Sequence, residues 1–181
     1  MGWPIGDTWA EVEKNPQLIY WPRTNKLGAE RKQYLHDKVL DLLNRLWVPN
    51  ANTILAIDEV ATVESLGQDV KEMITMYWRE ARSIGITLDA MKQRPQGVAR
   101  DMHSESTWAA AFQPKDEDDA KRYAEVLGGR RKWMSVLDAL DRDKHEFVLS
   151  NSRTRKAVIT WVDVPLRPLA PPSRTGDYAG R

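Results

Sequence analysis

The sequence contains no cysteine, which excludes a disulfide framework, thiol nucleophiles and thiolate-bound zinc. It also has no run of the roughly 18 apolar residues that a membrane span needs. The opening residues, Met1–Pro4, lack the basic region and apolar core of a signal peptide. Charge of one sign is not in excess, because 27 Lys and Arg face 26 Asp and Glu. No overall field therefore steers the chain towards nucleic acid or acidic lipid, and we expect a cytoplasmic protein without a membrane segment.

The 181 residues are 41% hydrophobic and 29% charged, a composition typical of a folded globular domain. At roughly 100–200 residues per domain, the length allows one domain and little more. We expect a single α/β domain over residues 1–164. Residues 165–181 are rich in proline without periodicity, which predicts a disordered tail.

Short apolar runs alternate with longer helical patterns along the chain, which is typical of strands joined by covering helices. We therefore predict an α/β fold with a largely parallel sheet flanked by helices. The run Thr53–Ile57 has no polar alternation, so it is predicted to be buried on both faces. The predicted strands are Leu18–Trp21, Thr53–Ile57, Ile86–Met91, Trp108–Phe112 and a closing hairpin of His145–Leu149 and Ala157–Val162. The predicted helices are Ala29–Trp47, one that begins at Leu66 and ends near Ile84-Gly85, Asp116–Leu127 and Trp133–Leu140.

Two adjacent carboxylates, Asp58 and Glu59, follow the strand Thr53–Ile57. An apolar strand that ends in two acids is the Walker B arrangement of nucleotide hydrolases. One acid can hold a magnesium ion while the other orients or deprotonates the attacking water. This pattern assigns Mg²⁺ to Asp58 and the water to Glu59, although many buried strands also end in acidic turn residues.

A second element follows about thirty residues later, where another predicted strand ends in Gln93-Arg94-Pro95. The helix before it ends in Arg82-Ser83-Ile84-Gly85-Ile86. Together with Asp58-Glu59, these motifs resemble the FtsK/HerA superfamily of P-loop ATPases that pump DNA, in which an Arg-x-x-Gly-Ile turn precedes a strand ending in Thr-Gln-Arg-Pro. The resemblance covers residues 54–98, and more weakly 116–149.

The resemblance implies roles for four residues of this chain. Asp58 becomes the Mg²⁺-linked acid, Glu59 the catalytic base and Gln93 a polar sensor near the γ-phosphate. Arg82 becomes a candidate for stabilising transition-state charge, across a subunit interface if the protein assembles. ATP and Mg²⁺ are the implied cofactors, and DNA and a homo-oligomer are the implied partners.

The chain departs from the family pattern in one large respect, since Gly-x-x-x-x-Gly-Lys-Ser/Thr occurs nowhere in it. That loop supplies the backbone amides and the lysine that cradle phosphates. Lys92 stands where the family has a small hydroxyl residue, and Asp89 interrupts the apolar strand. The predicted fold is thus P-loop NTPase-like without its first strand and phosphate loop.

Three functional hypotheses follow. The chain is the ATPase-like part of a motor for DNA translocation, packaging or transfer; or a non-catalytic module that keeps the fold for assembly or partner binding; or one half of a composite ATPase that another chain completes. Whether it hydrolyses ATP depends on a phosphate loop supplied from elsewhere. The three histidines have no ligand spacing, so no zinc site is predicted.

Overall fold

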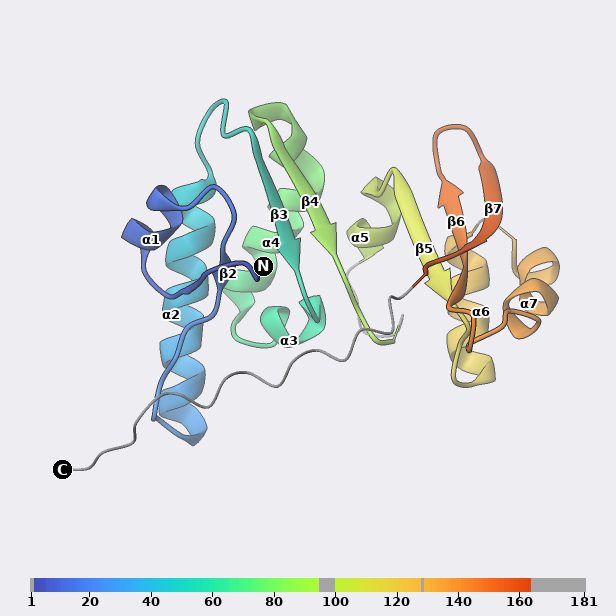
Figure 1. Ribbon diagram of the computed structural model, residues 1–181, viewed down its shortest axis with the longest axis horizontal. Coiled ribbons are helices and arrows are strands. Elements are labelled where there is room, and N and C mark those ends of the chain that lie inside the picture. Colours follow the sequence, from blue (N-terminus) through green and yellow to red (C-terminus); the bar gives the residue numbers. More distant parts are fainter. Residues whose placement is uncertain (1, 95–99, 128, 164–181) are drawn as a thin grey trace.

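The computed structural model describes residues 2–94, 100–127 and 129–163. Two strand groups lie side by side, each in front of its own helices (Figure 1). The first is the parallel pair β3 (Thr53–Ile57) and β4 (Ile86–Ala90), with α2 (Gly28–Leu46), α3 (Val60–Glu64), α4 (Gln68–Glu80) and the 3₁₀ turn η1 (Ala81–Ile84). The second is the antiparallel sheet β5 (Trp108–Phe112), β6 (Glu146–Asn151) and β7 (Lys156–Trp161), with α6 (Glu117–Val126) and α7 (Arg130–Asp138). The short helix α5 (Arg100–Glu105) lies between the two groups.

The β3–β4 pair is covered by helices on one face. Helix α4 presents Val70, Ile74 and Tyr77 at the i, i+4, i+7 spacing of one helix face, and all three are buried. The Tyr77 hydroxyl donates a 2.7 Å hydrogen bond to the carbonyl oxygen of Leu43 in α2, which ties the two helices together. The predicted helix Ala29–Trp47 and both strands of this unit are confirmed within one residue at each end. The helix predicted from Leu66 to near Ile84 instead divides into α4 and the 3₁₀ turn η1.

The other face of β3–β4 differs from the prediction of burial on both sides. Side chains alternate along β3, and Ile54 is 75% exposed. The same face of β4 carries Thr87 and Asp89, which are also exposed. Asp89 therefore does not interrupt the core, because its side chain points away from it. Among the described residues, helices pack against one face of this pair only.

The C-terminal sheet corrects the prediction of a largely parallel fold. Strands β6 and β7 form the predicted hairpin, and β5 pairs antiparallel with β6. Parallel pairing is confined to β3–β4 and to the two-residue strands β1 (Ile5–Gly6) and β2 (Ile19–Tyr20), at least in the part of the chain described. A separate cluster, Ala111, Ala124, Leu137, Leu140 and Val148, forms the core between this sheet and α6 and α7.

The N-terminal segment packs beside α2 (Figure 1). Its helix α1 (Trp9–Lys14) begins with a capping box between Thr8 and Glu11, which satisfies two otherwise unpaired backbone donors. The predicted strand Leu18–Trp21 is shortened to β2. The predicted tail, 165–181, falls outside the described residues. No described helix is long and apolar enough to cross a bilayer.

Gly85 lets β4 begin directly after η1. Its φ of 85° lies in the left-handed region, which a side chain makes costly. A Cβ here would also approach the backbone nitrogen of Asn52 to 3.2 Å. The carbonyl oxygen of Gly85 accepts from the backbone nitrogen of Thr53 at 3.1 Å, so this glycine aligns the starts of β3 and β4.

An ionic contact joins α2 to α4. The ring of His36 lies between Asp37, at 2.9 Å, and Asp69, at 2.8 Å. Gly67 is needed beside it, because a Cβ there would come within 2.6 Å of the His36 ring. Hydrogen bonds to Asp37 and then to Asp69 raise the pKa of His36, and the bond from His36 lowers the pKa of each aspartate.

We expect this contact to stabilise the protein in a limited pH window. The raised pKa of His36 gives a contribution that is complete below about pH 6.5 and is lost as the pH rises through the folded-state pKa. The lowered pKa values of Asp37 and Asp69 give a contribution that is present above about pH 4 and is lost at lower pH. Thermal unfolding should therefore show His36→Gln to be destabilised more at about pH 5.5 than at about pH 8.5. An equal deficit at both values would contradict a protonated His36.

Candidate functional site

The predicted site residues lie at the carboxyl edge of the β3–β4 pair, where open parallel sheets bind their ligands. Asp58 and Glu59 follow β3 directly, and Lys92, Gln93 and Arg94 follow β4. Two backbone hydrogen bonds hold the turns together: Met91 donates to the carbonyl oxygen of Ile57 at 2.9 Å, and Val60 donates to that of Met91 at 3.0 Å.

Glu59 is brought against Gln93. The backbone N–H of Gln93 donates to Oε2 of Glu59 at 3.3 Å, across 34 positions of sequence. Glu59 is half-buried and has a φ of 51°, so a non-glycine residue occupies the left-handed region at the start of α3. Such a conformation costs roughly 1–2 kcal/mol and requires support from its surroundings, which the bonds between the two turns provide.

Asp58 and Gln93 are both exposed at this edge. The exposed carboxylate of Asp58 is accessible to a hydrated cation, whereas Glu59 is partly shielded beside it. No described cluster of three or more His, Asp or Glu side chains could hold a metal by itself. A magnesium ion that keeps several waters and binds one carboxylate plus phosphate oxygens still fits this donor set.

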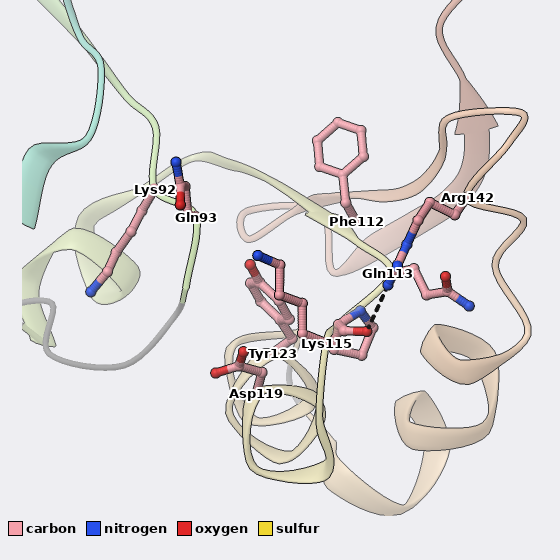
Figure 2. A pocket seen from close by; sticks show the side chains of 9 residues that line it. Lys92, Gln93, Phe112, Gln113, Lys115, Asp119, Tyr123 and Arg142 are labelled. Atoms are coloured by element: carbon pink, nitrogen blue, oxygen red, sulfur yellow. Dashed lines mark hydrogen bonds between the residues drawn. The ribbon is translucent and has the colours of Figure 1, made fainter.

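A pocket of about 330 Å³ opens between the turns that follow β4 and β5 (Figure 2). Residues after β4 form one wall and residues after β5 and in α6 form the other. Three of its lining side chains are cationic and one is a buried carboxylate. The pocket is lined by Lys92, Gln93, Phe112, Gln113, Pro114, Lys115, Asp119, Tyr123 and Arg142.

Sequence reasoning missed the carboxylate of Asp119. Its residue is 1% exposed, and its Oδ1 is buried without a hydrogen-bond partner among the described residues. The Oδ2 atom lies 3.6 Å from Nε of Arg94, whose Nη2 donates to Asp116 at 2.9 Å. Arg94 therefore links the turn after β4 to the start of α6. The only sequence signal was a run of acids read as the first turn of a helix.

Glu64 was also missed. It lies one turn after Val60 on the buried face of α3, and burial raises the pKa of its carboxyl. Lys92 lies nearby, and burial lowers the pKa of its amine while the charges of Glu59, Glu64 and Asp119 act in the opposite direction. The charges of three carboxylates therefore act on Lys92.

Arg82 lies at the amino ends of β3 and β4, opposite to the carboxyl ends where Asp58 and Glu59 lie. It is exposed in η1, before β4 begins, whereas Glu59 follows the end of β3. Five strand residues at about 3.3 Å each put roughly 16 Å between the two edges. Within one chain the structure does not bring Arg82 to Asp58 and Glu59.

The tryptophans and the basic clusters named here are not part of this candidate site. Trp47 and Trp78 pack against the β3–β4 core. Trp3 and Trp21 are exposed in the N-terminal segment. The basic cluster Arg153–Lys156 lies exposed at the β6–β7 turn, and the side chains of Arg130 and Arg131 are outside the described part.

Comparison with solved structures identifies the class of fold. The chain is similar to viral genome-packaging NTPases, and so has a mixed α/β fold like that of a P-loop NTPase. No protein-family model and no curated protein sequence matches it.

The similar structures include several of the genome-packaging NTPase B204. B204 of Sulfolobus turreted icosahedral virus 2 in complex with ATP-γS superposes with a TM-score of 0.61 at 10% identity, over 90% of this chain and 74% of that one. The AMPPCP complex gives 0.60 at 10% identity, over 88% and 73%. B204 of Sulfolobus turreted icosahedral virus, described as a DNA-packaging ATPase, gives 0.57 at 14% identity, over 84% and 69%.

Proposed function

We propose that this chain forms the Walker B side of an ATP-hydrolysing motor of the DNA-packaging or DNA-translocating type. The observation that carries the proposal is the contact between the Glu59 carboxylate and the Gln93 backbone, at the carboxyl edge of adjacent parallel strands. The two motifs are distant in sequence and carry the resemblance independently. The structural similarity to B204, whose structures hold ATP analogues, supports the same conclusion.

The two acids have different surroundings and therefore different proposed roles. Asp58 is exposed and would hold Mg²⁺, which neutralises charge on the phosphates when bound. Glu59 is held against Gln93 and would accept a proton from the attacking water. The Gln93 side chain, exposed beside it, would contact the γ-phosphate or that water.

Arg82 has a proposed role only in an assembly. Because it lies at the opposite edge from Glu59, it would stabilise transition-state charge in the site of a neighbouring subunit. This role requires a homo-oligomer. DNA would be the partner that the homo-oligomer translocates.

A second candidate function is a non-catalytic module for assembly. The observation that favours it is the absence of Gly-x-x-x-x-Gly-Lys-Ser/Thr from all 181 residues. Asp58 and Glu59 would then be polar strand ends. The two functions differ in whether ATP is hydrolysed. A chain that has been supplied with a phosphate loop can distinguish them.

The proposal is tested by ATP binding and hydrolysis with and without a phosphate loop. Residues 1–181 alone should show no micromolar ATP binding by calorimetry, because carboxylates without amide donors repel phosphates. The same chain fused to the strand, phosphate loop and helix of an FtsK/HerA ATPase should hydrolyse ATP in a Mg²⁺-dependent reaction. Tight binding by the chain alone would contradict the need for a loop. A fusion that binds Mg²⁺-ATP without hydrolysing it would favour the assembly module.

A further inference from the structure

The sheet β5–β6–β7 has one covered face and one open face. Side chains alternate along each strand, so the register of the ladder assigns every strand residue to one of the two faces. Ala111, Val148 and Ala157 share the face that packs against α6 and α7. The residues between them along the strands therefore point to the opposite face, away from these helices.

The open face is apolar and rich in aromatic side chains. Phe112 and Phe147 lie opposite each other on β5 and β6, with ring centroids 4.9 Å apart. Trp108, at the other end of β5, is 60% exposed, and Phe112 is 50% exposed. Leu149 on β6 pairs with Val158 on β7, which is 57% exposed. These five side chains form the aromatic face, and a contiguous apolar surface of this kind indicates a binding site.

The chain leaves the sheet beside the phenylalanine pair of this face. Strand β7 pairs Thr160 with Phe147, which in turn pairs with Phe112, so β7 ends at the row of the two rings. After β7 the chain, coloured red in Figure 1, crosses in front of β6. The described part ends at Asp163, and residues 164–181 follow it.

Residues 164–172, the proline-rich segment, have the spacing of a polyproline II helix. All of them are apolar except Arg167. The prolines and leucines recur at every third residue in two sets. One set is Pro165, Pro168 and Pro171, and the other is Leu166, Leu169 and Pro172. A polyproline II helix has three residues per turn, so each set lines one side of it. The segment has no helix or strand periodicity, but in this conformation it presents two apolar stripes.

The aromatic face fits such a segment in chemistry and in size. Proline-rich segments bind to grooves lined by aromatic side chains, because their preformed conformation loses little entropy on binding. Residues 164–172 at about 3.1 Å each extend over roughly 28 Å. Crossing from β7 to the phenylalanine pair takes about 10 Å, and following β5 to Trp108 takes about 13 Å more. The segment is long enough for this path.

We propose that the proline-rich segment binds across the aromatic face of its own chain. Leu166 packs on the phenylalanine pair, and Leu169 and Pro172 continue along β5 to Trp108. The segment follows β7 without a linker, and so short a tether gives an effective concentration of about a millimolar or more. Contacts that are weak between separate chains are therefore populated within one chain. The sequence predicts disorder for this segment by itself, and the sheet supplies the apolar surface that the segment lacks.

A spin label on the segment tests this contact in the full chain. Because the chain has no cysteine, Arg167→Cys provides a single attachment point, on the side of the segment that carries neither apolar stripe. We expect the label to remove most of the NMR signal intensity of the Trp108 indole N–H and of the backbone N–H groups of Phe112 and Phe147. Signals of α2, which belongs to the other strand group, should keep their intensity.

The matched control is the same labelled chain with Leu166→Asp and Leu169→Asp, which leaves residues 1–163 unaltered. The charged side chains should release the segment, and the three signals should recover. Unchanged signals in the labelled parent would overturn the proposal. Equal loss in parent and control would overturn it as well, because a tail that only moves near the sheet does not require the two leucines.

A mixing experiment distinguishes binding in cis from binding to a second copy. Spin-labelled chain is mixed with isotope-labelled chain that carries no spin label, and NMR detects only the latter. We expect no loss of signal at Trp108, Phe112 and Phe147. Loss of these signals would mean that the segment of another copy occupies the face, which would overturn the assignment in cis.

A dye that binds exposed apolar surface provides a second measurement without a spin label. The chain with Leu166→Asp and Leu169→Asp should increase the fluorescence of this dye severalfold relative to the parent chain, because the aromatic face becomes uncovered. Equal fluorescence of the two chains would contradict coverage of the face by the segment. Neither measurement uses nucleotide, so the outcome is independent of the proposed function.

Discussion

Glu59→Gln should lower the rate of ATP hydrolysis by about 10²–10⁴-fold in the chain that has been supplied with a phosphate loop. Glutamine keeps the size of the side chain and can still accept the Gln93 N–H, which lies 3.3 Å from the carboxylate. It removes the basicity that proton transfer from water requires. ATP binding should therefore survive, and the variant should retain bound ATP instead of turning it over.

Asp58→Asn is the matched comparison, because the neighbouring acid loses the same charge at an exposed position. It should weaken Mg²⁺-nucleotide binding itself, since a carboxylate leaves the proposed metal shell. Calorimetry for binding and steady-state phosphate release for turnover distinguish the two variants. Turnover of Glu59→Gln within about threefold of the parent would contradict the general-base role of Glu59. Asp58-Glu59 would then be interpreted as the polar end of a strand.

Ile74→Ala should lower the free energy of unfolding by about 2–5 kcal/mol. Ile74 is 0% exposed at the centre of the α4 face that packs on β3–β4. Its truncation leaves a cavity that surrounding side chains fill only in part. Urea unfolding of the full chain measures the change.

Glu72→Ala is the control for that variant, because Glu72 is exposed on the same helix and contacts only Gln68 at the surface among the contacts described. Its effect should stay within about 0.5 kcal/mol. Equal destabilisation by the two variants would mean that the α4 face does not carry the core.

The sequence predicted the parts of the fold that depend on local patterns. The apolar run Thr53–Ile57 and the spacing of Val70, Ile74 and Tyr77 were sufficient to locate β3 and α4. The direction of β5 was not predictable in this way, because its pairing with β6 depends on contacts about 40 residues apart. The exposure of Ile54 was missed for the same reason, since it depends on which elements cover the sheet.

The candidate site was predicted in part. That Asp58, Glu59 and Gln93 share one edge follows from two parallel strands of equal length, and the structure places them there. Their catalytic roles remain predictions. Asp119 and Glu64 could not be found from the sequence, because an acid in a helical pattern is ordinarily solvated and only packing makes it buried.

The ion pairs of Arg94 join the turn after β4 to α6. Arg94 directly follows Gln93, and its guanidinium contacts Asp116 and Asp119 at the beginning of α6. Arg94 therefore connects the backbone beside Gln93 with α6, which packs against all three strands of the C-terminal sheet. Under the proposed function, these ion pairs would couple the occupancy of the carboxyl ends of β3 and β4 to the position of the C-terminal sheet.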